Sequence, residues 1–339
     1  MSVDLRSLAT AVPEAVVEAI AGARRALVAT HENPDADTIG AALAIAALVR
    51  GHDGGATVVC SDPIPALYAF FPGVEAIRQD PEPGAAYDLL VVCDCGTLDR
   101  VGAVRDRHRA LFDGLPRVVL DHHVSNGGGG PADWIDPDAA ATCEMVTLLA
   151  ARLDAPLDGG GGALATVLMA GIVMDTATFA HSNATPRTLA VSAALVEAGA
   201  PLSDISRRLY RTKPDAQLRL FGRVLDRLET SADGLVIWST LLESDLTSTG
   251  SAPAHSEGII DLLSQSERAE VAIVFKENGS ATRVSVRTKP GGVDATELTG
   301  RFGGGGHARA AGATIALPVA EARPLVTAEA ARLAAAVRR

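Results

Sequence analysis

The chain has 339 residues, which is long enough for two domains with separate hydrophobic cores. Hydrophobic residues make up 47% and charged residues 21%, which excludes a disordered chain, and no run approaches the roughly 20 apolar residues of a membrane span. A formal net charge of −11 argues against wrapping around long nucleic acid, which requires an extended basic surface.

The first apolar run ends in a cluster of ligating side chains. Residues 25–30 predict a strand, and the alanine-rich stretch that follows predicts a helix. His31, Asp35 and Asp37 fall on the turn between them, where open α/β sheets collect ligands. Helix capping by Asp37 or Thr38 is the alternative explanation, but a cap uses one oxygen and leaves the other side chains unexplained. We therefore predict metal binding at this turn.

Three later segments repeat the pattern of an apolar run followed directly by ionisable side chains. These side chains are Asp94, the triplet Asp121-His122-His123 and, after a predicted helix, Asp175. A carboxylate at the end of a buried run costs several kcal/mol unless it is paired or bound to a cation. Carboxylates and imidazoles together suit Mn²⁺, with Co²⁺, Mg²⁺ and Zn²⁺ as alternatives. The pattern predicts a divalent metal centre.

The first part of the chain, residues 1–190, predicts a mostly parallel, doubly wound α/β sheet. Its apolar runs alternate with helical or glycine-rich segments. The glycine runs at 127–130 and 159–162 lack the Lys-Ser/Thr of a Walker loop, so we interpret them as connections. Residues 191–232 have helical spacing of apolar positions and predict a helical connector.

The last part of the chain, residues 233–339, predicts a smaller mixed-sheet α/β domain. Three strand-like segments occur in it, together with helical patterns at 256–263 and 295–302. Its basic side chains gather in one stretch and comprise Arg283, Arg287, Lys289, Arg301, His307 and Arg309. Glycines before the histidine allow backbone N–H groups to approach a phosphate, and an arginine fork can hold one. This stretch predicts a site for a short anionic ligand.

Cysteine usage and the N terminus indicate a cytoplasmic protein. Cys60, Cys93, Cys95 and Cys143 follow no zinc-ligand spacing and are predicted to be buried free thiols, which fits a reducing compartment. The first four residues show no basic region followed by an apolar one, as a secretory signal would. We expect no membrane partner.

In combination, these motifs resemble those of the DHH phosphoesterase superfamily. The matching residues are His31-x-x-x-Asp35-x-Asp37, Asp94, Asp121-His122-His123, Gly171-Ile172-x-x-Asp175-Thr176, Ser285-Val286-Arg287 and Phe302-Gly303-Gly304-Gly305-Gly306-His307. The order and length are most similar to the oligoribonuclease and pAp-phosphatase (nanoRNase) branch, which includes stand-alone phosphodiesterases of cyclic di-AMP and pApA. The resemblance implies a DHH catalytic domain followed by a DHH-associated substrate-binding domain.

The resemblance also implies a role for each matching residue. Two divalent cations, most simply Mn²⁺, are expected, one held by His31, Asp35 and Asp94, the other by Asp37, Asp94, His122 and Asp175, with Asp94 bridging. The expected catalytic residues are Asp94, His123 facing the phosphoryl group, and Asp121 orienting a histidine. The expected substrate contacts are Arg100, Asn126, Arg287, Gly304, Gly305, Gly306 and His307.

The sequence thus predicts a two-metal-dependent phosphodiesterase. Its expected substrates are cyclic di-AMP, pApA and short oligoribonucleotides, cleaved to AMP, together with the phosphomonoester pAp. Two alternatives stay open. One is a manganese-dependent inorganic pyrophosphatase. The other is a non-catalytic nucleotide sensor, but such a protein should have lost a metal ligand, and in this chain every expected ligand position is filled. A RecJ-type exonuclease would need additional domains. The preferred substrate, the exact metal and homodimer formation, which is frequent in the family, are not decided by the sequence.

Overall fold

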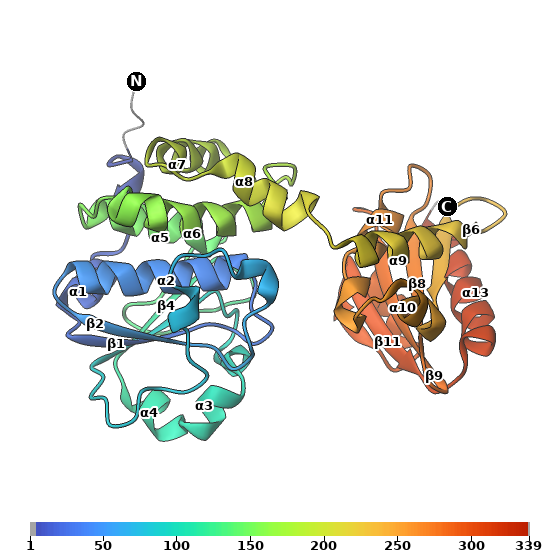
Figure 1. Ribbon diagram of the computed structural model, residues 1–339, viewed down its shortest axis with the longest axis horizontal. Helices are drawn as coiled ribbons and strands as arrows, with labels where there is room; N and C mark the ends of the chain where they lie inside the picture. The colour runs from blue at the N-terminus through green and yellow to red at the C-terminus, as the bar shows by residue number, and fades with distance from the viewer. Residues whose placement is uncertain (1–4, 338–339) are drawn as a thin grey trace. The chain divides into compact units, whose positions relative to one another are not determined.

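The computed structural model describes residues 5–337. Residues 1–4, on which the prediction of no secretory signal was based, lie outside this range. The chain divides into two compact units, Met1–Thr212 and Lys213–Arg339 (Figure 1). The stretch that the sequence assigns to a connector, residues 191–232, is shared between these units. Each unit has its own sheet and its own hydrophobic clusters.

The first unit contains an all-parallel sheet. Its strands are β1 (Arg25–Ala29), β2 (Gly55–Val59), β3 (Leu89–Cys93), β4 (Arg117–Asp121) and β5 (Trp134–Ile135), in the order β2-β1-β3-β4-β5. The predicted α/β sheet is confirmed. Because the register pairs Ala29 with Val92 and Cys93 with Leu120, the residues that follow three of these strands meet at one edge of the sheet.

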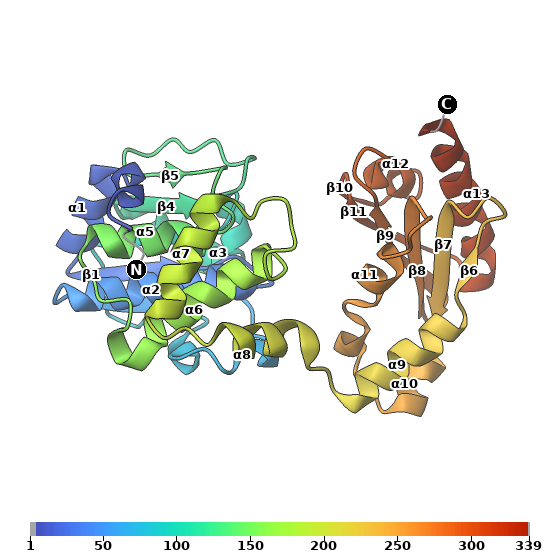
Figure 2. The same ribbon diagram turned by 90° about the horizontal axis from the view of Figure 1, so that it is seen from above.

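Helices cover both faces of this sheet (Figures 1 and 2). The helices of this unit are α1 (Glu14–Gly22), α2 (Ala36–Gly51), α3 (Ala103–Arg107), α4 (Arg109–Gly114), α5 (Thr142–Arg152), α6 (Gly159–Asp175), α7 (Pro186–Glu197), α8 (Leu202–Ser206), a π-helix (Arg207–Arg211) and 3₁₀ turns at Leu8–Ala11, Ala66–Tyr68, Val74–Ala76 and Leu98–Val101. Of these, α7 and α8 pack on α6 as an outer layer (Figure 1). Strand alternation sends Ala26 and Val28 to a core shared with α2, α5 and α6, and Leu27 and Ala29 to a core shared with α3 and α4. The small side chains of α2 allow α6 to pack closely over it.

The second unit contains a mixed sheet. Its strands are β6 (Glu229–Thr230), β7 (Val236–Leu241), β8 (Val271–Asn278), β9 (Ala281–Thr288), β10 (Gly305–His307) and β11 (Ala310–Ile315), in the order β10-β11-β9-β8-β7-β6. Its helices are α9 (Asp215–Asp226), α10 (Glu243–Thr249), α11 (Ile259–Ser264), α12 (Ala295–Gly300) and α13 (Val319–Val337), with a 3₁₀ turn at Pro253–Ser256. α12 and α13 cover one face, and α9, α10 and α11 cover the other. The predicted mixed-sheet domain is also confirmed.

One local prediction in this unit was wrong in detail, and one strand was not predicted. The helix predicted over 256–263 begins only at Ile259, because Gly258 adopts the left-handed conformation at φ 81° and the preceding residues form a 3₁₀ turn. The glycine run at 303–306, for which no strand was predicted, ends in strand β10, which pairs antiparallel with β11. The four cysteines are buried and free, as predicted.

Within residues 5–337, we find no single helix with the length and apolarity to cross a bilayer. The pair Pro186–Glu197 and Leu202–Arg211, bent by 113°, satisfies the length and composition criteria only when its two helices are taken together.

Candidate metal centre

The six residues predicted as metal ligands converge at the carboxyl edge of the first unit's sheet. Three groups of ligating atoms form there, each with its atoms within 4.8 Å of one another: His31, Asp35 and Asp94; Asp37, His122 and Asp175; and Asp94, His122 and His123. Asp94 and His122 each belong to two groups and so join the three into one centre.

Asp94 lies in the middle of this centre. It directly follows β3 with φ 60°, a left-handed conformation that aspartate tolerates better than most residues. Its Oδ2 lies 3.7 Å from His31 Nε2, and its Oδ1 lies 3.5 Å from His122 Nε2. The Thr142 hydroxyl donates to the same Oδ1 at 3.1 Å. The two oxygens of one buried carboxylate therefore face two different groups of ligands.

Asp35 combines a structural role with a free oxygen. Its Oδ1 accepts the backbone N–H groups of Asp37 and Thr38, at 3.0 and 3.1 Å, so Asp35 is the cap of α2 in place of the two residues weighed from the sequence. Its Oδ2 lies 3.7 Å from His31 Nε2. His31 uses Nδ1 on the carbonyl of Glu32 at 2.7 Å, which directs Nε2 toward the carboxylates.

Asp37 is fully buried and is held by main-chain groups. Its oxygens accept the backbone N–H groups of Thr142 at 2.6 Å and Cys143 at 2.8 Å, both in the first turn of α5. The positive end of the helix dipole favours a carboxylate at this place. Helix α6 passes so close that a Cβ at Gly171 would lie 2.5 Å from Asp37 Oδ1, which explains the glycine there.

His122 and Asp175 complete the centre. His122 Nε2 lies 3.1 Å from Asp175 Oδ2, while Nδ1 donates to the carbonyl of Ala139 at 3.3 Å. Asp175 is the last residue of α6. The hydroxyl of the next residue, Thr176, donates to the carbonyl of Ile172 at 2.6 Å and accepts the backbone N–H of Phe179 at 3.0 Å, so it does not contact the Asp175 carboxylate in these bonds.

Burial and mutual repulsion raise the pKa values of two carboxylates of the centre, Asp37 and Asp175. Burial, with the charges of Asp94 and Asp175, raises the pKa of Asp37 well above its usual range. Burial and the charge of Asp94 raise the pKa of Asp175 to about 6, against the opposing effect of its bond with His122. Buried carboxylates that repel one another in this way require either protons or a cation.

The imidazoles respond in the opposite direction. Burial alone would lower the pKa of His31, but its hydrogen bonds with Asp35 and Asp94 outweigh burial and raise it to about 10. The bond with Asp175 and the nearby carboxylate charges likewise outweigh burial at His122 and raise its pKa to about 10.

This donor set fits divalent cations. Ligands about 2.0–2.2 Å from an ion lie roughly 3–3.5 Å from one another, and the measured separations run from 3.1 to 3.7 Å. Carboxylate oxygens with imidazole nitrogens suit Mn²⁺ and its neighbours in the first transition row. Asp94 belongs to the group with His31 and Asp35 and also to the group with His122 and His123.

His123 is held beside the centre by Asp121. Its Nδ1 lies 2.7 Å from Asp121 Oδ1, a hydrogen bond that raises the pKa of His123. Burial would raise the pKa of Asp121, but bonds from His123 and Asn126 outweigh it and lower it to about 2. Asn126 donates to Asp121 Oδ2 at 2.6 Å, and Gly96 N–H donates to the same oxygen at 2.7 Å. Asp121 therefore acts as an anchor for its neighbours.

Arg100 also lies near this histidine. A Cβ on Gly96 would be 3.8 Å from His123 Cγ and 3.9 Å from Arg100 Nη1, so both side chains flank the same glycine. The arginine is exposed, and its guanidinium is available next to His123. Of the substrate contacts predicted in the first unit, both Arg100 and Asn126 thus lie beside the Asp121–His123 pair.

The remaining predicted contacts lie in the second unit, around a groove of about 990 Å³. Strand alternation on β9 places Arg283, Ser285 and Arg287 on the groove face, while the valines between them enter the core. Arg287 Nε donates to Asp261 at 3.0 Å. Gly304 and Gly305 line the groove, and Gly306 and His307 follow on β10.

The glycines of this run differ in what they require. A Cβ at Gly304 would collide with the carbonyl oxygen of Gly312, because the chain crosses β11 closely there. A Cβ at Gly305 would meet nothing within 4 Å. Gly304 therefore has a packing reason to be glycine, whereas the lack of a side chain at Gly305 leaves space in the groove.

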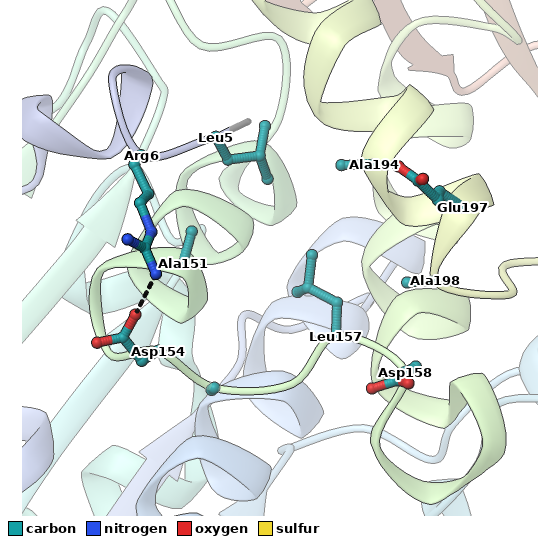
Figure 3. Close-up of a pocket in the computed structure, with 10 residues that line it drawn as sticks. Leu5, Arg6, Ala151, Asp154, Leu157, Asp158, Ala194, Glu197 and Ala198 are labelled. Atoms are coloured by element: carbon teal, nitrogen blue, oxygen red, sulfur yellow. Dashed lines mark ion pairs between the residues drawn. The ribbon is translucent and has the colours of Figure 1, made fainter. Parts of the chain in front are cut away.

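Another pocket of the first unit, of about 400 Å³, contains none of the predicted residues (Figure 3). Leu5, Ala151, Leu157 and Ala194 give it an apolar lining, and Arg6 lies 3.7 Å from Asp154 at its rim.

Several residues that position the centre were missed or left undecided from the sequence. Thr142, whose hydroxyl reaches Asp94, was missed, and Tyr210 donates to the carbonyl of Met174, next to Asp175, at 2.7 Å. Arg187 and Asn183 lie shortly after Asp175 along the chain, and from the sequence alone each could be either a substrate contact or a loop residue.

Comparisons with known proteins find matches to both parts of the chain. Residues 25–172 match the DHH family N-terminal domain, and residues 239–336 match the DHHA1 domain. The chain is 32% identical to the bifunctional oligoribonuclease and PAP phosphatase NrnA of Thermus thermophilus, over 85% of this chain and 83% of that protein. It is 26% identical to the protein of the same name from Bacillus subtilis, over 84% and 87%.

A solved structure shares the fold over nearly the whole length. An exopolyphosphatase-related protein from Bacteroides fragilis superposes with a TM-score of 0.84 at 19% identity, covering 96% of this chain and 98% of that one.

Proposed function

The chain belongs to the DHH family and is a phosphoric ester hydrolase, and from this premise we propose a phosphodiesterase that depends on two divalent cations. The proposed substrates are short oligoribonucleotides and pAp, by similarity to the relatives named above, and also pApA and cyclic di-AMP. The proposed cations are Mn²⁺.

One observation carries this proposal. Asp94 is buried, and its two carboxylate oxygens face imidazoles of two separate groups, His31 on one side and His122 on the other. A carboxylate placed in this way suits the ligand shared by a pair of cations. We propose that His31 and Asp35 complete one position and that Asp37, His122 and Asp175 complete the other.

Bound there, the cations would supply activation of a water for attack on phosphorus and would offset the charge of the phosphoryl group. The protein supplies the rest. His123, held through Nδ1 by Asp121, keeps Nε2 available to donate a hydrogen bond or a proton to the oxygen that leaves phosphorus. The hydrogen bond with Asp121 raises the pKa of His123, which favours the charged imidazole that a proton donor requires.

Substrate recognition is proposed for both units. Arg100 flanks Gly96 together with His123, and Asn126 donates to Asp121, the partner of His123. Arg287, Gly304, Gly305, Gly306 and His307 belong to the glycine-rich region of the second unit. Arg283 and Arg287, on the groove face of β9, give that groove positive charge suited to phosphates.

The test is hydrolysis of pApA by Mn²⁺-loaded protein, followed by chromatography of AMP. We expect complete conversion, loss of turnover in EDTA and recovery on addition of Mn²⁺. Absence of turnover in folded protein that binds Mn²⁺ would contradict the proposal. Parallel reactions with pAp, cyclic di-AMP, an RNA trimer and pyrophosphate rank the substrates, and a preference for pyrophosphate would favour a pyrophosphatase instead.

A further inference from the structure

One short segment of the first unit, residues 136–143, touches three of the proposed ligands. The carbonyl of Ala139 accepts from His122 Nδ1 at 3.3 Å. The backbone N–H groups of Thr142 and Cys143 bind both oxygens of Asp37, at 2.6 and 2.8 Å.

The same segment reaches the third ligand through a side chain. The Thr142 hydroxyl donates to Asp94 Oδ1 at 3.1 Å. The position of this segment therefore sets the orientation of one imidazole and two carboxylates.

An ion pair between Glu144 and Arg187 holds this segment in place. Glu144 is completely buried, and its Oε2 accepts the backbone N–H of Ala140 at 3.2 Å. Its Oε1 accepts Arg187 Nε at 2.5 Å. Arg187 Nη1 in turn lies 2.9 Å from Asp136 Oδ2, so one guanidinium spans the segment from its beginning to the helix that follows.

Two neighbours of the arginine strengthen this connection. The Thr188 hydroxyl donates to Glu144 Oε2 at 2.8 Å, and Thr188 belongs to the first turn of α7. Asn183 donates to the carbonyls of Ala140, at 3.1 Å, and Asp175, at 3.2 Å. The start of α7 and the end of α6 thus hold the same segment.

Stability alone does not explain the pair. Buried ion pairs are frequently no more stable than apolar residues of similar volume, because desolvation offsets their attraction. Among the described residues, Arg187 Nη2 is buried with no hydrogen-bond partner, which is a further cost. The role that remains for the Glu144–Arg187 pair is to hold residues 136–143 in one position, in spite of the desolvation cost.

We infer that Glu144 and Arg187 are positioning residues, which act on the metal centre through residues 136–143 without touching a cation or the substrate. The inference rests on the proposed function, because it assigns the pair to the geometry of the proposed ligands. Outer partners of metal ligands commonly change metal affinity by about 10- to 100-fold when removed.

The experiment measures Mn²⁺ affinity by titration calorimetry of metal-free protein, together with kcat and KM for pApA. We expect Arg187→Gln to weaken Mn²⁺ binding about 10- to 100-fold and to lower kcat with little change in KM. Arg187→Lys keeps the charge but not the fork, so we expect an intermediate affinity. Asp136→Asn, at the less buried end of the connection, should weaken binding in the same direction and provides the decisive measurement if Arg187→Gln does not fold.

A matched pair in the second unit controls for general destabilisation. Arg227 contacts the buried Asp245 with two nitrogens, each at 2.5 Å, far along the chain from every proposed ligand. Arg227→Gln should lower the melting temperature but leave Mn²⁺ affinity unchanged. Folded Arg187→Gln and Asp136→Asn proteins with wild-type Mn²⁺ affinity and kcat would overturn the inference, whereas wild-type protein that binds no Mn²⁺ would overturn the metal centre itself.

Discussion

The two carboxylate oxygens of Asp94 face two different proposed ligands, His31 and His122. Its backbone adopts a left-handed conformation with φ 60°. Asparagine tolerates that conformation nearly as well as aspartate, so Asp94→Asn removes the charge without disturbing the turn. Losing a shared ligand should cost several kcal/mol of transition-state stabilisation, roughly a 10³-fold fall in kcat/KM for pApA. Asp94→Ala should lose at least as much and also unfold at lower temperature.

A near-normal rate in Asp94→Asn would contradict the bridging role. The matched control is Asp99→Asn, an exposed carboxylate five residues along the chain, which should leave kcat/KM unchanged.

The imidazoles make cation binding depend on pH. Because the pKa values of His31 and His122 lie near 10 in metal-free protein, both rings are protonated at pH 7 and must release their protons to bind a cation. Mn²⁺ affinity should therefore rise with pH between 6 and 9, with proton release on binding. Titration in two buffers of different ionisation enthalpy measures this release, and equal heats in both buffers would contradict it.

At this scale, the sequence was sufficient to predict which ionisable side chains cluster, but not the residues that orient them. His31, Asp94 and Asp121 could be found because each lies at the end of an apolar run. Thr142 and Glu144 could not, because their partners lie 48 and 43 residues away along the chain and no local pattern marks a hydrogen bond over such a separation.

At the scale of elements, the strands were the most predictable parts because burial on both faces leaves continuous apolar runs. Strand β10 was not, since glycine has low strand propensity and its pairing with β11 depends on a close approach of two backbones. The cap of α2 was also misassigned, because Asp35 and Asp37 are chemically the same and only the backbone conformation distinguishes them.

The glycine run allows packing and substrate binding to be separated. Gly305→Ala adds a methyl group that meets nothing in the protein, so the melting temperature should stay within about 1 °C of wild type while KM for pApA rises. Gly304→Ala should destabilise the protein by about 1–3 kcal/mol, because its methyl group collides with the backbone of β11. Thermal unfolding and steady-state kinetics measure both effects. An unchanged KM in Gly305→Ala would remove this glycine from the proposed substrate contacts.

At the scale of the whole molecule, every proposed ligand belongs to the first unit, so cations should stabilise that unit selectively. A ligand at 100 times its dissociation constant stabilises the folded state by about 2.7 kcal/mol. The chain has two tryptophans, Trp134 in the first unit and Trp238 in the second. Fluorescence of Trp238→Phe should report unfolding of the first unit and shift upward with Mn²⁺, whereas Trp134→Phe should show little shift. Equal shifts in both variants would contradict the assignment.

The order of the units along the chain has a consequence for biosynthesis. All six proposed ligands, from His31 to Asp175, precede the division at Thr212. Domains generally fold as units, the N-terminal one first, while the ribosome is still translating the remainder. A nascent polypeptide can therefore acquire its cations before its groove for phosphates has been made.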